Sequence, residues 1–107
     1  MSLNKDLIGK LINVTSKAAV ACYRHVGKKN KKIADKEATD SMRKNLNFLD
    51  IKGKVVIGEG ELDEAPMLFI GENLGTGKGP VIDIAVDPLE GTNFVANNLP
   101  GALSVIA

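Results

Sequence analysis

The feature that most restricts the fold of this chain is an apolar, β-branched run, VIDIAV (residues 81–86), which ends directly at Asp87 and Pro88. Such a run is typical of a buried strand. Because proline has no amide hydrogen for a neighbouring strand, we expect Pro88 to end the strand and force a turn. A shorter run, residues 54–57, ends at Gly58 and leads into an acidic stretch. The sequence therefore predicts two strands that each end at a carboxylate-bearing segment.

Two stretches before these strands have apolar residues at helical spacing. The first spans residues 4–26, with Asn4 or Ser2 as its cap and Gly27 at the position that usually follows a helix. The second spans residues 34–48, and its apolar stripe consists of Ala34, Ala38, Met42 and Leu46. Toward the C-terminus we expect a short strand or helical turn (67–70), a glycine-rich loop (71–80), a short helix (93–97) and a strand (102–107).

The composition excludes several classes of protein. The 107 residues are 44% hydrophobic and 25% charged, as in one small globular domain. No apolar run approaches the roughly 18 residues of a membrane span, and the N-terminus has no signal peptide. The lone Cys22 forms no internal disulfide, which favours the cytoplasm. We expect Cys22 to pack in the core and His25 to be structural, since one histidine and one cysteine do not suit a zinc site.

The net charge of +1 conceals two oppositely charged halves. Residues 1–54 hold 13 Lys or Arg and 5 Asp or Glu, whereas residues 55–107 hold 1 and 8. A basic half beside an acidic half suits a site that holds cations and an anionic substrate together. The alternative is that these charges only solvate exposed faces.

The segment from Asp87 to Thr92, DPLEGT, indicates a metal and phosphate site. A turn after the strand would bring Asp87 and Glu90 together, and hard cations such as Mg²⁺ or Mn²⁺ prefer carboxylate oxygens. Gly91 allows the backbone to approach a bound group, and a helix that starts near Thr92 would present free amides to an anion. The alternative is a plain Asp-Pro turn, with Thr92 as the N-cap of the helix that follows.

A second acidic cluster, GEGELDE (residues 58–64), follows the first strand. Its four carboxylates repel one another unless cations neutralise them. The flanking glycines expose Glu59, which is a second candidate ligand at the end of a strand, although a solvated loop is the alternative. Strand ends are where sites form in open α/β sheets, so we expect the two clusters to share one site.

The basic loop GKKNKK (residues 27–32) is a further candidate region, because lysine side chains contact phosphates. A nucleic-acid patch is an alternative, but no aromatic residue interleaves the loop to stack on bases. Asp35 lies near the start of the second helix, where the helix dipole alone would account for it.

Two segments resemble one known family. IGEGELDEAPML (residues 57–68) and VIDIAVDPLEGT (residues 81–92) are similar to the signature segments of class II fructose-1,6-bisphosphatases, the GlpX type. The segment from Lys31 to Arg43 also resembles that family's pattern of basic loop, Ala-Asp and helix. The resemblance extends from about residue 7 to residue 107.

The resemblance implies an α/β sugar-phosphatase fold of layered helices and sheet, shared with inositol monophosphatases. It implies hydrolysis of the 1-phosphate of fructose 1,6-bisphosphate with Mn²⁺ or Mg²⁺, in gluconeogenesis. By this resemblance Asp35 and Glu59 are ligands of one metal ion, and Asp87 and Glu90 are ligands of the other. Substrate phosphate is held by Glu90, Gly91 and Thr92. Thr92 also orients the water, and Lys31 and Asp63 assist the chemistry.

The family is longer than this chain, so residues 1–107 are expected to be the N-terminal, metal-binding part of a phosphatase domain. The chain ends within an apolar run, which predicts a truncation. Because the sugar-binding part of the family is then missing, we expect the fragment to be inactive. The resemblance implies that the full-length enzyme is a homo-oligomer. The expected partner is a sugar bisphosphate, with no nucleic acid and no membrane. The alternatives are an inositol-monophosphatase-like enzyme and a non-catalytic truncated product.

Overall fold

The computed structural model describes residues 5–59 and 67–107 of the chain. Its elements are, in order, α1 (Lys5–Tyr23), α2 (Lys31–Asn47), β1 (Lys52–Ile57), β2 (Asn73–Leu74), β3 (Val81–Glu90), α3 (Thr92–Ala96) and β4 (Leu103–Ile106). The expected helix caps Ser2 and Asn4, and Asp63 with most of the acidic cluster, lie outside the described residues.

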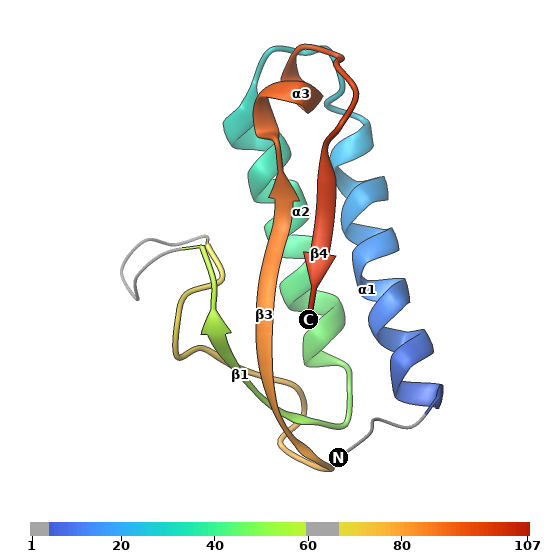
Figure 1. The fold of residues 1–107 in the computed structure, drawn as a ribbon, viewed down its shortest axis with the longest axis vertical. Helices are drawn as coiled ribbons and strands as arrows, with labels where there is room; N and C mark the ends of the chain where they lie inside the picture. The colour runs from blue at the N-terminus through green and yellow to red at the C-terminus, as the bar shows by residue number, and fades with distance from the viewer. Residues whose placement is uncertain (1–4, 60–66) are drawn as a thin grey trace.

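The strands form one mixed sheet in the order β2-β1-β3-β4. β1 and β3 run parallel, whereas β2 and β4 are antiparallel to their neighbours. The helices α1 and α2 lie alongside each other and cover one face of the sheet (Figure 1). The expectation of helices layered on a sheet is therefore confirmed at the level of a mixed α/β arrangement.

The apolar stripe predicted for α2 forms the centre of the core. All four of its residues are completely buried, as are Ile51 and Val55 next to them. From α1 the buried residues are Leu7, Val14, Ala18 and Cys22. Ile12 belongs to the apolar pattern that predicts the first helix, but it is 61% exposed because α1 turns its other face toward α2.

The helix boundaries differ from the predicted ones. The side chain of Asn30 accepts a hydrogen bond of 3.1 Å from the amide of Ile33, so α2 is capped there and begins at Lys31 rather than near residue 34. α1 ends at Tyr23, before the predicted end. Gly27 adopts φ +74°, and its amide donates to the carbonyl of Val95 at 2.8 Å, which ties this connection to α3.

The prediction that Pro88 ends the strand is wrong. β3 continues to Glu90, and Pro88 is completely buried within it. β1 makes its last pairing with β3 at Ala85, so Pro88 faces no β1 partner that requires its amide. On the β4 side the register shifts between Asp87 and Glu90, and this bulge accommodates the missing donor.

The segment predicted to be a glycine-rich loop, residues 71–80, contains β2, which pairs with β1 through Leu74 and Gly53. Gly79, at φ +87°, lies so close to the carbonyl of Asp50 that a Cβ atom there would overlap it. The glycine therefore permits the close return of the chain toward β3. None of the helices in the described ranges is long and apolar enough to cross a membrane.

Candidate metal centre

The four carboxylates predicted to be metal ligands come from three elements that meet at one edge of the sheet. β1 and β3 are parallel neighbours, so their carboxyl ends reach the same edge. Glu59 lies just beyond β1, and Asp87 and Glu90 lie in the last part of β3. Asp35, from α2, interacts with both Glu59 and Asp87. The structure therefore pairs Asp35 with Glu59, places Asp87 where its charge acts on both, and pairs Asp87 with Glu90.

Asp35 and Glu59 form a coupled pair of carboxyl groups. Burial, together with the charge of Asp35, raises the pKa of Glu59 to about 7, although hydrogen bonds from Thr39 and the Leu68 backbone oppose this rise. Burial also raises the pKa of Asp35, partly offset by a hydrogen bond with Glu59. A pair of half-buried carboxyl groups that favours protonation is a place where a divalent cation can supply the positive charge instead.

Asp87 and Glu90 form a second pair, on either side of the bulge in β3. Burial raises the pKa of Asp87, the negative charge of Glu90 adds to the rise, and a hydrogen bond from the Leu89 backbone opposes it. Glu90 is exposed at the end of the strand. The bulge, rather than the predicted turn, brings these two carboxylates into interaction.

The donor set fits a hard divalent cation, since all four candidate ligands supply carboxylate oxygens. In residues 5–59 and 67–107, no three His, Cys, Asp or Glu side chains lie close enough together to form a complete metal cluster. The chemistry of the residues therefore suits Mn²⁺ or Mg²⁺, while the ligand assignment stays a prediction.

The residues predicted to hold phosphate form the junction between β3 and α3. Gly91 adopts φ +85° in the left-handed region, and a Cβ atom there would lie 2.7 Å from the ring of Phe94. Thr92 is the first residue of α3 and is half-buried. Glu90, Gly91 and Thr92 therefore follow one another directly at the edge where the carboxylates gather.

The start of α2 places Lys31 and Asp35 one turn apart on the same helix. Lys31 is the first residue of α2 and is exposed. Asp35 lies beyond the first turn, in which no acidic residue occurs, so the helix dipole does not account for its position. In the adjoining basic loop the amide of Lys29 donates to the carbonyl of Ala96, which holds the loop against α3.

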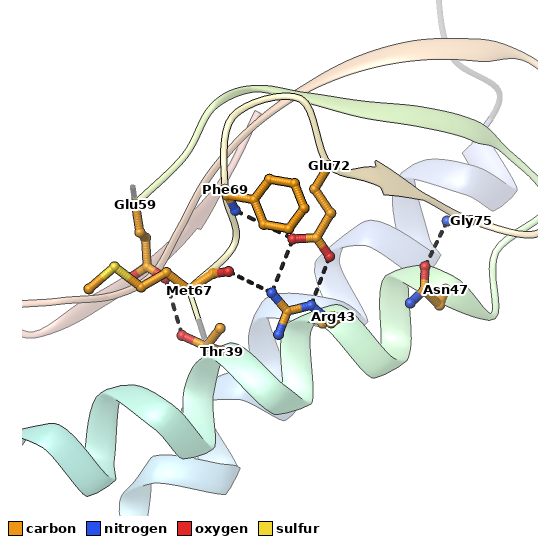
Figure 2. Close-up of polar contacts among 8 residues, drawn as sticks. All are labelled: Thr39, Arg43, Asn47, Glu59, Met67, Phe69, Glu72 and Gly75. Carbon is orange, nitrogen blue, oxygen red and sulfur yellow. Dashed lines mark hydrogen bonds and ion pairs between the residues drawn. The ribbon is translucent and has the colours of Figure 1, made fainter. Parts of the chain in front are cut away.

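A set of polar residues that the sequence reasoning missed follows Asp35 along α2 at four-residue intervals: Thr39, Arg43 and Asn47 (Figure 2). Each of the three contacts the connection between β1 and β3. Each of these polar residues directly follows a residue of the apolar stripe, so both sets repeat every four residues. This four-residue repeat of polar residues was the signal available in the sequence. Polar residues at this spacing usually indicate only a solvated face.

Of the residues that the sequence assigned to structure, Cys22 packs in the core as expected, and the role of His25 stays a prediction. Cys22 is buried, and burial raises the pKa of its thiol, which disfavours the reactive thiolate. The side chain of His25 is 17% exposed, and its Nε2 atom lies 3.9 Å from Oε1 of Glu37.

Comparison with known proteins agrees with these observations. Residues 5–107 match the family model described as bacterial fructose-1,6-bisphosphatase, glpX-encoded. A relative from Prochlorococcus marinus (strain AS9601), named D-fructose 1,6-bisphosphatase class 2/sedoheptulose 1,7-bisphosphatase, is 49% identical over 98% of this chain. A protein of the same name from Synechococcus sp. (strain CC9902) is also 49% identical over 98% of the chain. The chain spans about a third of the length of these curated relatives, 32% and 31% respectively.

Proposed function

The chain belongs to the glpX-encoded family of bacterial fructose-1,6-bisphosphatases, and we propose that it supplies the metal-binding part of a sugar-bisphosphate phosphatase. The substrate class follows from the relatives, whose names specify fructose 1,6-bisphosphate and sedoheptulose 1,7-bisphosphate. The observation that carries the proposal is the convergence of Asp35, Glu59 and Asp87 from three separate elements. The negative charges that raise the pKa values of Asp35 and Glu59 come from other carboxylates of this group, which supports a site that takes up a cation.

In this proposal Asp35 and Glu59 hold one divalent cation, and Asp87 and Glu90 hold a second. The bound cations, Mn²⁺ or Mg²⁺, would neutralise phosphoryl charge and lower the pKa of water. Gly91 and Thr92 bind the substrate phosphate beside them, and the Thr92 hydroxyl orients the water. Lys31 contributes positive charge, and Asp63 assists proton transfer.

The activity of the whole enzyme belongs to a chain about three times as long as this one in the relatives. We therefore expect the 107-residue chain to bind metal ions but to release little or no phosphate from fructose 1,6-bisphosphate. Phosphate release by the isolated chain at the rate of a full-length relative would contradict this expectation.

A chimera tests the proposed function directly. The segment of the Prochlorococcus marinus relative that matches this chain would be replaced by the chain itself, and phosphate release would be measured with Mn²⁺. We expect turnover of both sugar bisphosphates, and a loss of about 10²–10³-fold in kcat for Asp87→Asn, because the variant would hold less tightly the cation that stabilises the transition state. The matched control is Asp83→Asn, an exposed residue of the same strand, which should leave kcat nearly unchanged. Equal activity of the two variants in a folded chimera would refute the assignment.

A further inference from the structure

We propose that Arg43, with Thr39, is a positioning residue that sets the metal affinity of the Asp35 and Glu59 pair. This inference rests on the proposed function, because it concerns the same metal centre. It assigns a role to residues of α2 outside the predicted metal ligands and phosphate-binding residues.

Arg43 holds the segment after the acidic cluster through three hydrogen bonds. Its Nε donates to Oε2 of Glu72 at 2.8 Å, and its Nη2 donates to Oε1 of Glu72 at 3.0 Å and to the carbonyl oxygen of Met67 at 2.6 Å (Figure 2). The side chains of Arg43 and Glu72 are only 27% and 11% exposed. A two-pronged arginine–carboxylate contact in such a place fixes orientation as well as distance.

Glu72 is in turn fixed to the backbone around it. Its Oε1 accepts a hydrogen bond of 3.4 Å from the amide of Phe69, and its own amide donates to the carbonyl of Phe69 at 3.1 Å. The carbonyl of Glu72 accepts from the amide of Val55 in β1 at 2.9 Å. Arg43 therefore binds the turn at residues 69–72, which is itself hydrogen-bonded to β1.

The next link is the backbone of Leu68, which follows the carbonyl that Arg43 holds. The amide of Glu59 donates to the carbonyl of Leu68 at 2.9 Å, and the Leu68 backbone also hydrogen-bonds to the Glu59 carboxylate. Gly58 allows this approach, because a Cβ atom there would overlap the Leu68 carbonyl. By holding the carbonyl of Met67, Arg43 thus fixes the neighbouring Leu68 backbone, to which Glu59 is hydrogen-bonded.

Thr39 acts on Glu59 directly from one helical turn earlier. It is 1% exposed, and its hydroxyl donates to Oε2 of Glu59 at 3.2 Å. Asp35 lies one turn before Thr39, so a single helix carries the partner carboxylate and the two residues that place Glu59 beside it. Contacts that orient a metal ligand in this way are worth about 10–100-fold in metal affinity.

Asn47 supplies a matched control, since it is the last of the polar residues that follow Asp35 along α2 at four-residue intervals. Its Oδ1 accepts a hydrogen bond of 3.0 Å from the amide of Gly75, at the far end of the connection from Glu59 (Figure 2). Asn47→Ala therefore removes a contact between the same helix and the same connection without touching the support of Glu59. A purely structural role of the stripe would make the Arg43 and Asn47 variants alike.

The experiment measures Mn²⁺ affinity of the chain by electron paramagnetic resonance of free Mn²⁺, at temperatures where circular dichroism shows each variant to be folded. We expect Arg43→Met and Thr39→Val to weaken binding by about 10-fold or more, and Asn47→Ala to change it by less than about 2-fold. Arg43→Lys keeps the positive charge but not the two-pronged contact with Glu72, so its Mn²⁺ affinity should lie between those of Arg43→Met and the wild type. Arg43→Met with wild-type affinity, or Asn47→Ala with an equal loss, would overturn the positioning role.

Hydrogen exchange provides a readout that needs no metal ion. Arg43→Met, or Arg43→Lys if the first variant does not fold, should accelerate exchange of the Glu59 amide, and Asn47→Ala should not. Unchanged exchange in the Arg43 variants would overturn the proposal. Asp35→Asn separates the two hypotheses: if it abolishes Mn²⁺ binding while Arg43→Met does not, only the positioning role fails. If the wild-type chain binds no Mn²⁺, the metal centre fails as well.

Discussion

Substitution of Glu59 by glutamine should stabilise the metal-free protein at neutral and higher pH while abolishing its stabilisation by Mn²⁺. The pKa of Glu59 is raised from 4.5 to about 7 by burial and by the charge of Asp35. Between these two values the folded state binds more protons than the unfolded state, so stability falls as pH rises through this window. Glutamine keeps an oxygen that can accept the hydrogen bond from Thr39, but it carries no charge at any pH.

The size of the effect follows from the pKa. A rise of this size corresponds to about 3 kcal/mol if the site is fully shielded from water. The carboxyl group of Glu59 is only partly buried, so screening reduces the expected gain of Glu59→Gln near pH 8 to about 1–2 kcal/mol. The pKa values of Asp35 and Asp87 are also raised, so part of the pH dependence should persist in the variant.

Urea unfolding followed by circular dichroism measures this effect, because urea leaves the ionic strength unchanged and does not screen the carboxylates. Stability would be determined near pH 5 and near pH 8, in EDTA and with excess Mn²⁺. We expect the wild-type chain to lose stability between these pH values in EDTA and to recover it with Mn²⁺. The variant should show a weaker pH dependence and little response to Mn²⁺.

Asp83→Asn is the control for the change in net charge, since Asp83 is exposed on β3. It should alter stability by no more than about 0.5 kcal/mol and keep the response to Mn²⁺. The reasoning is refuted if Glu59→Gln destabilises the metal-free protein near pH 8, or if its decline in stability from pH 5 to pH 8 equals that of the wild type.

Three further substitutions and one thiol reaction test the packing of the fold. Gly58→Ala should lower the free energy of unfolding by about 1–3 kcal/mol in urea titrations, because its Cβ would overlap the Leu68 carbonyl. Gly9→Ala should raise it by about 0.5–1 kcal/mol, because a Cβ there would have no atom within 4 Å. A loss of stability in both variants would contradict the steric argument. Asn30→Ala should cost about 1 kcal/mol by the same measurement, because the cap of α2 is lost, and an unchanged stability would show that the cap contributes nothing. The thiol of Cys22 should react with a thiol reagent far more slowly in the native chain than in urea, and equal rates would contradict its burial.

The apolar stripe of α2 and the strands β1, β3 and β4 were predictable because they depend on local spacing. Ala34, Ala38, Met42 and Leu46 recur every four residues, and all are buried. The same reasoning failed at Pro88, because a strand can continue through a proline wherever no neighbouring strand needs a hydrogen-bond donor at that position. β1 stops pairing at Ala85 and β4 shifts register across the bulge, and neither fact is encoded near residue 88.

The gathering of the carboxylates was predictable only in part. Two acidic segments at the ends of parallel strands predict a shared edge, which accounts for Glu59 and Asp87. Asp35 comes from a helix, so its placement depends on the packing of α2 on the sheet, and the sequence indicated it only by resemblance to a family. The grip of Arg43 on Glu72 could not be predicted, since 29 residues separate them and other acidic residues compete for the arginine.

The two stripes of α2 connect the stability of the fold to the geometry of the site. Each polar residue of the second stripe directly follows a buried residue of the first, so Asp35 follows Ala34 and Arg43 follows Met42. Successive residues differ by about 100° around a helix, which directs one stripe into the core and the other to the connection that carries Glu59. A rotation or slide of α2 that repacked the core would therefore displace Asp35 from Glu59. Ala34 and Ala38 are completely buried, so the packing around them fixes the position of α2 and with it the spacing of the carboxylate pair.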